Sequence, residues 1–281
     1  MALRLGVDLG GTKIEVAVYD DDGRELMRRR APTPRAGYDV ALEEFVHLIA
    51  EAEKEAGGRC SVGIGMPGTI APRSGRVVNA YNTPFNGRRL KHDLEKKLDR
   101  ELRFANDANC FALSEAVDGA ARGAAVVFGA ILGTGAGGGI VVQGRVLNGL
   151  HGISGEWGHT PLPWMRADEY PGPPCNCGRR GCIEQFCSGP AKNRDRDALG
   201  EDRAMALFTD RLARAFSLVI NFLDPDMIVV GGGMSKHDEI YAAVPPLLRK
   251  YVYHADPRTP IVRAAHGDAS GVRGAAMLWP A

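Results

Sequence analysis

The sequence predicts an α/β protein made of two similar units, each a mixed β-sheet with helices packed on it. Two observations predict this fold class. Apolar and alternating runs follow the order β-β-β-α-β-α-β up to residue 107, and a comparable order of strands and helices restarts at residue 124. In both halves a turn rich in Gly and Thr joins the first two strands. We therefore expect two related domains that hold a ligand between them.

The first half contains strands with apolar or alternating patterns and helices with apolar residues at helical spacing. A helix at 38–56 is indicated by Val40, Leu42, Phe45, Leu48 and Ile49. A second helix is expected at 90–99. The expected strands cover 3–8, 14–20, 26–34, 61–68 and 102–107.

The second half repeats the pattern with two strands and a further turn at 124–149. Helices are expected at 203–223 and near 238–252, and strands at 227–233 and 260–265. Residues 191–202 bridge the gap before the helix at 203 as a connecting stretch.

Composition is that of a globular protein with a substantial core. The chain has 281 residues, of which 44% are hydrophobic and 25% charged, and its formal net charge is +1. This charge gives no indication of binding to nucleic acid or to a membrane, and no apolar run approaches the roughly 18 residues of a membrane span. Three of the six Cys lie within 175–182, unlike a secreted disulfide framework, so we expect a reducing cytoplasm.

Asp107 is the first candidate for chemistry. It lies between a predicted strand and a predicted helix, with Asn106 and Asn109 on either side in the stretch AsnAspAlaAsn. A strand fixes such a side chain and the following turn exposes it, which suits a catalytic group. Taken alone, the residue is better explained as the N-cap of the following helix, because Asp is common at that position.

Three glycine-rich stretches predict contacts with a nucleotide. Backbone N–H groups left uncovered by glycine, together with a hydroxyl and a cation, suit phosphate oxygens, and Asp8 can hold Mg²⁺ through water. The alternative for each stretch is an ordinary tight turn. The candidates are Asp8, Gly10, Gly11, Thr12 and Lys13 in the first stretch, Thr134 and Gly135 in the second, and Gly232, on the side of the base or ribose, in the third.

His159, Cys175, Cys177 and Cys182 predict a structural zinc site. Three clustered thiols with Gly178 and Gly181 at the bends, completed by a histidine, form a four-ligand Cys₃His set with no open position. The alternative is buried free cysteine.

Two carboxylates flank this set. Glu156 and Glu184 can accept paired hydrogen bonds from sugar hydroxyls, and His159 can serve both zinc and a hydroxyl. Most glutamates, however, are simply solvated surface residues.

The motifs DLGGTK, GMPG, NDAN, GTGAGGG, GEWGH, CNCGRRGC followed by IE, and VVGGG occur in this order. This series resembles the ROK family of sugar kinases and related repressors over nearly the whole chain. No helix-turn-helix segment precedes the first motif, so we expect a kinase rather than a repressor.

The resemblance implies a two-domain actin-like (ribonuclease H-like) ATPase fold with an interdomain cleft and a zinc-braced loop. The domains would be 1–118 plus 270–281, closed by a C-terminal helix, and 119–269 with the zinc loop 156–184. It implies a homodimer and ATP, Mg²⁺ and structural Zn²⁺ as ligands. Asp107 would be the general base for the sugar C6 hydroxyl. The implied sugar-binding residues are Gly68, Asn106, Asp107, Glu156, His159 and Glu184.

Within the family the chain looks most like bacterial fructokinases, in stretches such as PTPRAGY and GEWGHTPLPWM. N-acetylglucosamine kinases of the family usually have Phe where Trp157 stands. Fructose is therefore the expected hexose, with N-acetylglucosamine, mannose or glucose as alternatives. A sugar-sensing regulatory protein is the non-enzymatic alternative. One departure is a segment near 190–203 that lacks roughly 20 residues, more than a connecting loop.

Overall fold

The computed structural model describes residues 3–34, 36–80 and 83–280, and the chain divides into two compact units. The first unit comprises Met1–Ser114, Val146–Ser154 and Ala269–Ala281. The second unit comprises Glu115–Arg145 and Gly155–Asp268. Among the described residues, none of the helices is both long and apolar enough to span a bilayer.

The sheet of the first unit has five strands in the order β3-β2-β1-β4-β7. The first three strands are antiparallel, whereas β4 and β7 run parallel to β1. The strands are β1 (Leu3–Leu9), β2 (Lys13–Tyr19), β3 (Glu25–Pro32), β4 (Cys60–Met66) and β7 (Arg103–Asn106), and a small separate hairpin contains β5 (Thr69–Ile70) and β6 (Val77–Val78).

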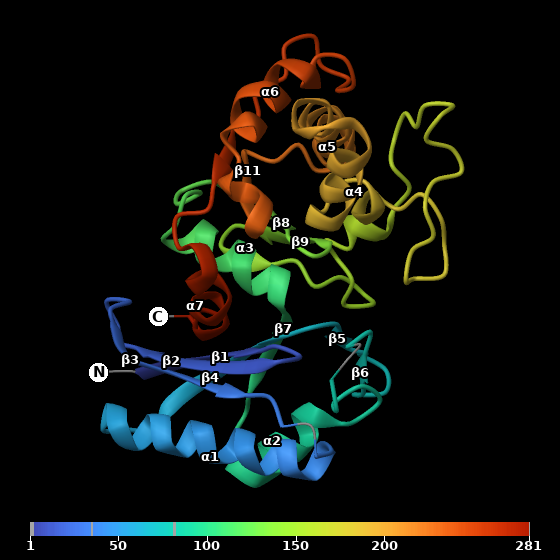
Figure 1. Ribbon diagram of the computed structural model, residues 1–281. Coiled ribbons are helices and arrows are strands. Elements are labelled where there is room, and N and C mark those ends of the chain that lie inside the picture. Colours follow the sequence, from blue (N-terminus) through green and yellow to red (C-terminus); the bar gives the residue numbers. More distant parts are fainter. Residues whose placement is uncertain (1–2, 35, 81–82, 281) are drawn as a thin grey trace. The chain divides into compact units, whose positions relative to one another are not determined.

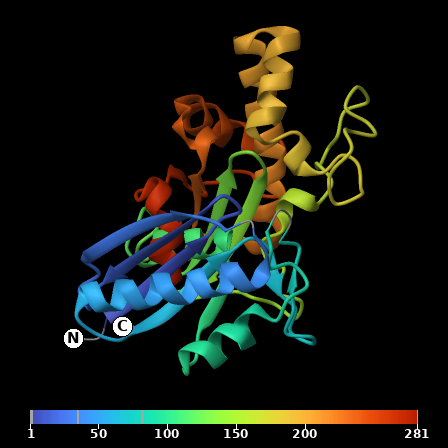
Figure 2. The same ribbon diagram turned by 60° about the horizontal axis from the view of Figure 1, so that its bottom comes forward.

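Helices cover both faces of this sheet. Figure 1 shows α1 (Tyr38–Ala56) and α2 (Leu90–Leu98) on one face and α7 (Ser270–Ala276) on the other. Figure 2 shows α1 lying along the same sheet after rotation. The expected helix at 38–56 is confirmed in its bounds, because the apolar stripe with Phe45 and Ile49 is buried and Gly57 ends the helix in a left-handed conformation.

Helix α7 packs directly on the backbone of β1 and β4. A Cβ atom at Gly6 would lie 1.9 Å from the carbonyl oxygen of Val272, and one at Gly63 would lie 1.8 Å from that of Ala275. Only glycine permits this approach. Beyond the helix, Trp279 Nε1 donates to the Val62 carbonyl at 2.7 Å, so the C-terminal segment is fastened to the sheet of the first unit.

The sheet of the second unit has the same topology. Its order is β10-β9-β8-β11-β12, so in both units the third, second, first, fourth and fifth strands of the sheet follow one another in space. The predicted α/β class with two related sheets is thereby confirmed. The strands are β8 (Val126–Leu132), β9 (Ala136–Val142), β10 (Arg145–Val146), β11 (Met227–Gly231) and β12 (Ile261–Arg263).

The helices not yet described are α3, α4, α5 and α6. Helix α5 buries an apolar face that includes Phe208, Leu212 and Phe216 in the core of the second unit. The helices span Asp107–Val117 (α3), Gly189–Leu199 (α4), Glu201–Leu223 (α5) and Asp238–Leu248 (α6), so α6 ends four residues before its expected end.

The stretch 191–202, expected to be only a connection, was predicted wrongly in part. Ser188 caps α4 by accepting a hydrogen bond from the N–H of Ala191, and Pro190 occupies the first turn, where its missing N–H costs nothing. The connection shrinks to Gly200, whose φ of 85° lets α4 end and α5 begin.

Candidate active site

The predicted site residues divide between the two units. In the first unit, Asp8, Met66 and Asn106 lie at or near the carboxyl ends of β1, β4 and β7, three neighbouring parallel strands. Met66 pairs with Asn106 in the register of β4 and β7. The carboxyl edge of parallel strands is where α/β proteins commonly bind ligands.

Asp107 is exposed at the junction of β7 and α3. Its Oδ1 accepts a hydrogen bond from the N–H of Ala108 at 2.8 Å, and Asn106 Oδ1 accepts from the same N–H at 2.9 Å. The carboxylate therefore helps to satisfy the helix N-terminus while lying at the surface of the unit. The position agrees with an exposed acid, whereas the N-cap position falls on Asn106, because Asp107 is the first residue of α3.

Asn106 joins the end of β7 to the loop after β4. Its Nδ2 donates to the carbonyl oxygen of Gly68 at 3.2 Å. Gly68 has a φ of 70°, and a Cβ atom there would lie 2.2 Å from the carbonyl oxygen of Val78. Glycine is thus required at 68, and the structure brings Gly68, Asn106 and Asp107 together.

The first glycine loop is the turn between β1 and β2. Gly10 N donates to the Lys13 carbonyl at 2.8 Å, and the Thr33 hydroxyl donates to the Gly10 carbonyl at 2.7 Å. Gly11 and the exposed Thr12 form the tip. Lys13 Nζ lies 3.4 Å from a carboxylate oxygen of the buried Glu15. The turn is therefore held by its own backbone and by Thr33, with Thr12 and Lys13 outermost.

Asp8 precedes this turn. Burial raises the pKa of its carboxyl, the nearby Glu15 raises it further, and Lys13 lowers it. Gly271 of α7 lies against the carboxylate, since a Cβ atom there would be 3.2 Å from Asp8 Oδ2. A carboxylate held out of water beside another acid is a group that a cation would stabilise, so Asp8 fits a Mg²⁺ site.

The second glycine loop joins β8 to β9 in the second unit. Gly133 N donates to the Gly135 carbonyl at 2.9 Å, and Thr134 at the tip is exposed. Gly232 follows β11 with a φ of 80°, and a Cβ atom there would lie 2.5 Å from the carbonyl oxygen of Leu132. Gly232 and the loop at Thr134 and Gly135 thus lie at the ends of the adjacent strands β8 and β11.

The four predicted zinc ligands come together in the second unit. The ligand atoms of His159, Cys175, Cys177 and Cys182 all lie within 4.8 Å of one another. Cys177 Sγ is 3.6 Å from Cys182 Sγ, and His159 Nδ1 is 3.5 Å from Cys175 Sγ. Tetrahedral zinc with Zn–S bonds of about 2.3 Å places its sulfur ligands roughly 3.8 Å apart. The four residues therefore fit a structural zinc ion.

The pKa values of two cysteines in this loop shift in opposite directions. Burial and the neighbouring thiols raise the pKa of Cys182 to about 12. Burial would raise the pKa of Cys177, but a hydrogen bond from the Arg179 backbone and contacts with the neighbouring thiols outweigh burial and lower it to about 7. Gly178 N donates to the Cys175 carbonyl at 3.0 Å, and Cys175 N donates to the Arg179 carbonyl at 2.8 Å. This tight turn presents sulfur atoms to a cation that must displace their protons.

Two carboxylates, Glu156 and Glu184, lie close in sequence to the predicted zinc ligands His159 and Cys182. Glu184 lies in a 3-10 turn, Ile183–Gln185, directly after Cys182, and its Oε1 lies 3.9 Å from Cys175 Sγ. Glu156 directly precedes the 3-10 turn Trp157–His159. Burial raises the pKa of Glu156, whereas His159 lowers it and Glu184 raises it. These three predicted sugar-binding residues therefore form one polar group.

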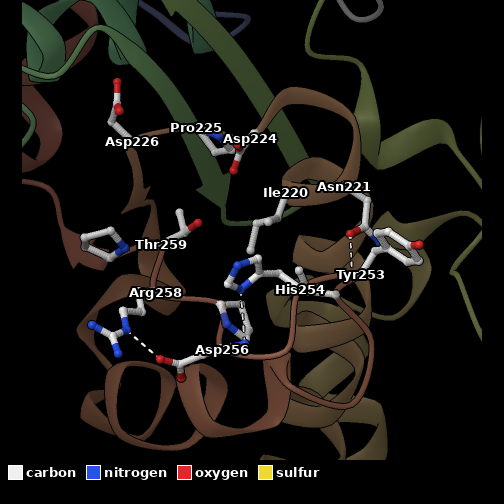
Figure 3. Close-up of a pocket in the computed structure, with 13 residues that line it drawn as sticks. Ile220, Asn221, Asp224, Pro225, Asp226, Tyr253, His254, Asp256, Arg258 and Thr259 are labelled. Carbon is white, nitrogen blue, oxygen red and sulfur yellow. Dashed lines mark hydrogen bonds and ion pairs between the residues drawn. The ribbon is translucent and has the colours of Figure 1, made fainter.

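A cavity of about 480 Å³ lies elsewhere in the second unit, between the end of α5 and the loop before β12 (Figure 3). Several of its polar groups bond to one another. Asp256 accepts from Arg258 at 2.6 Å, His254 accepts from the Asp256 backbone at 3.1 Å, and Asn221 accepts from the Tyr253 backbone at 2.9 Å. None of the predicted site residues lines it, and we assign it no function.

Comparison with known proteins identifies the chain. The model of the ROK family matches residues 4–281. The chain belongs to the ROK family. It is 40% identical, over 97% of both chains, to an N-acetyl-D-glucosamine kinase from Pectobacterium atrosepticum. That alignment runs over 296 positions, so the relative has residues without a counterpart in the 281 residues of this ROK protein.

Two solved ROK structures support the same fold. The ROK hexokinase from Thermus thermophilus has a TM-score of 0.87 at 31% identity and covers 98% of this chain and 97% of its own. A ROK family glucokinase from Streptomyces griseus, solved with glucose and AMPPNP, has a TM-score of 0.79 at 26% identity with 99% of each chain covered. The predicted family and actin-like fold class are confirmed.

Sequence reasoning did not assign a role to Asn109. It lies in the first turn of α3, its side chain is buried, and its Oδ1 has no hydrogen-bond partner among the described residues. Its position in the NDAN stretch is visible in the sequence, whereas its burial is seen only in the structure.

Proposed function

We propose that the sugar phosphorylated by this ATP-dependent ROK sugar kinase is N-acetyl-D-glucosamine, on its C6 hydroxyl. The observation that carries the proposal is the 40% identity, over 97% of both chains, to a relative named N-acetyl-D-glucosamine kinase. Fructose, the hexose expected from the sequence motifs, finds no support in the names of the relatives reported above.

Asp107 would act as the general base, accepting the proton of the C6 hydroxyl as its oxygen attacks the γ-phosphorus of ATP. Its exposed position at the end of β7 supports this role. Mg²⁺ near Asp8 would neutralise charge on the phosphates. Catalysis would otherwise consist of positioning, since phosphoryl transfer requires little covalent help from the protein.

The remaining predicted residues would hold the two substrates. Glu156 and Glu184 would accept hydrogen bonds from sugar hydroxyls. His159 would donate a hydrogen bond from Nε2–H to a hydroxyl oxygen, because its Nδ1 faces the cysteines. Sugar contacts are also proposed for Gly68 and Asn106. The phosphates and adenosine would be bound by Gly10, Gly11, Thr12, Lys13, Thr134, Gly135 and Gly232.

Fructose remains the second candidate because of the motif stretches that resemble fructokinases. One argument for it is weakened by the position of Trp157. That side chain is 5% exposed, stacks on Phe216 with ring centroids 5.4 Å apart, and donates from Nε1 to the Gly137 carbonyl at 2.8 Å. Trp157 is a core residue, so a Trp or Phe there reports on packing rather than on the sugar.

A coupled assay of ADP release with N-acetylglucosamine, fructose, mannose and glucose tests the proposal. We expect the highest kcat/KM with N-acetylglucosamine. A clear preference for fructose would replace the proposed substrate. If no sugar in the panel leads to ADP release, the result would favour a sugar-sensing regulatory protein. The family resemblance also implies a homodimer, so we predict that the purified protein used in this assay is dimeric.

A further inference from the structure

A small cavity of about 190 Å³ lies within the first unit, at the carboxyl ends of β4 and β7. Part of its wall is apolar, and three asparagines supply polar groups, two from the stretch AsnAspAlaAsn and one from the loop that contains Asn148. The lining residues that matter here are Met66, Ile70, Phe104, Asn106, Asn109 and Asn148. The cavity is smaller than the roughly 300–1,000 Å³ of pockets that enclose a drug-sized ligand. Its size suits one substituent of a sugar rather than a whole substrate.

Asn109 is the residue in this cavity with an unmet requirement. It is 3% exposed, and its Oδ1 accepts no hydrogen bond from any described residue. A buried amide oxygen without a donor destabilises a protein, and native structures rarely tolerate one without a reason. A ligand that brings an N–H or O–H group into the cavity would satisfy it.

Asn106 differs from Asn109 in this respect. Both ends of its amide are engaged by the backbone, with Nδ2 donating to Gly68 and Oδ1 accepting from Ala108. Asn106 thus shapes the edge of the cavity, whereas the oxygen of Asn109, which also lines it, accepts no hydrogen bond from the described residues. The loop that contains Asn148 and Gly152 also lines the cavity. It comes close to Thr69, because a Cβ atom at Gly152 would lie 2.6 Å from Thr69 Oγ1.

The apolar wall indicates which donor fits. Met66 is 1% exposed, and Ile70 and Phe104 are partly buried. A hydroxyl group alone would satisfy Asn109 and leave this wall in contact with water. An acetamido group carries an N–H donor next to a methyl group, so it can bond to the amide oxygen and cover the wall at once.

We propose that Asn109 is a specificity-determining residue. Its Oδ1 accepts a hydrogen bond from the amide N–H of the N-acetyl group of a hexosamine substrate. The inference rests on the proposed function and names the residue that separates N-acetylglucosamine from glucose. These two sugars differ only at C2, so their ratio of kcat/KM isolates the contact.

The test measures that ratio for the wild type and for Asn109→Ala and Asn109→Asp. Loss of one hydrogen bond to a buried acceptor should lower kcat/KM for N-acetylglucosamine in Asn109→Ala by about 10- to 100-fold, mainly through KM. Activity on glucose should change by less than about threefold. Asn109→Asp keeps an acceptor and should retain more of the preference than Asn109→Ala.

Ser114→Ala provides a matched control. Ser114 also lies on α3, is fully buried, and has an Oγ without a hydrogen-bond partner in the described part of the chain, but it does not line the cavity. We expect its ratio of kcat/KM for N-acetylglucosamine to kcat/KM for glucose to equal that of the wild type. Thermal shifts induced by each sugar in every variant report whether the protein is folded and whether sugar binding persists.

The outcomes separate the inference from the proposed function. If Asn109→Ala lowers kcat/KM equally for both sugars, or leaves the ratio of the two kcat/KM values unchanged, the inference is overturned and the kinase assignment stays intact. A wild type that turns over glucose or fructose but not N-acetylglucosamine overturns the proposed substrate and the inference with it. A selective fall for N-acetylglucosamine supports both.

Discussion

Glu184 Oε2 accepts a hydrogen bond from the backbone N–H of Ala136 at 3.2 Å. The residue that follows the cysteine cluster by two positions thus holds the glycine loop between β8 and β9. The other carboxylate oxygen lies 3.9 Å from Cys175 Sγ. One side chain therefore connects the proposed zinc loop with the loop proposed for phosphate binding.

Gly135 is predicted to matter because of Glu184. A Cβ atom at Gly135 would lie 2.4 Å from Glu184 Oε2, so Gly135→Ala must displace the carboxylate. We expect kcat/KM to fall by about 10-fold or more, equivalent to about 1.4 kcal/mol or more. In a Glu184→Ala background the added methyl group has nothing to displace, and the second substitution should cost little. Strictly additive losses in this double-mutant cycle would reject the coupling.

Zinc is predicted to be bound at one ion per chain. Elemental analysis of the purified protein should find it, and Cys182→Ser should retain less than about a tenth of it after dialysis against a chelator, because one of four ligands is lost. Cys60→Ser is the matched control, since Cys60 lies outside the cluster and its Sγ faces the Gly58 carbonyl at 3.6 Å. A folded, active wild type without zinc would rule out the site.

Glu169 is predicted to set the acid limit of stability. Burial alone would raise its pKa, but hydrogen bonds from Arg214, the Arg166 backbone and Arg211 lower it to about 2. Because the folded-state pKa lies below the unfolded value, this contribution is fully present above about pH 4.5 and is lost as pH falls to about 2.

Glu169→Gln tests this contribution by urea unfolding at several pH values. It should lower the free energy of unfolding at pH 7 by about 1.5–3 kcal/mol, since two buried arginines lose one of their carboxylate partners and keep the other, Asp195 or Asp210. The difference from the wild type should shrink between about pH 4.5 and 2. Glu55→Gln breaks an exposed pair with Arg29 and should cost less than about 1 kcal/mol. Equal effects of the two substitutions would contradict the prediction.

Trp157→Phe is predicted to change stability and not sugar choice. The smaller ring loses stacking area against Phe216 and leaves the Gly137 carbonyl without its donor, at a cost of about 1–3 kcal/mol. The order of preference in the sugar panel should stay the same. A reversal between N-acetylglucosamine and fructose would show that position 157 does govern specificity.

Much of the fold could be predicted because local signals agreed with the tertiary structure. The helix Tyr38–Ala56 combines an apolar stripe with flanking glycines, and the strands leading to Asn106 and Gly231 end at recognisable turns. The four zinc ligands were predictable because cysteine and glycine spacing restricts a loop tightly. In these cases short-range sequence carries the information.

Other features depend on contacts between distant segments. The helix Gly189–Leu199 is charged and weakly amphipathic, and its packing against α5 stabilises it. The arginines that form ion pairs with Glu169 lie more than 40 residues away in sequence. The burial of Asn109 likewise requires the sheet and α3 to be assembled. No local pattern encodes such pairings, so only the structure identifies them.

The most direct test of the kinase mechanism compares ADP formation by the wild type and Asp107→Asn at saturating ATP and N-acetylglucosamine. Asn keeps the shape and can still accept the hydrogen bond from Ala108 N, but it cannot take the hydroxyl proton. We predict a fall in kcat of about 10²- to 10⁴-fold with sugar binding retained in a thermal-shift assay. Asp107→Asn turning over at more than about a tenth of the wild-type rate would contradict the role of Asp107 as the base.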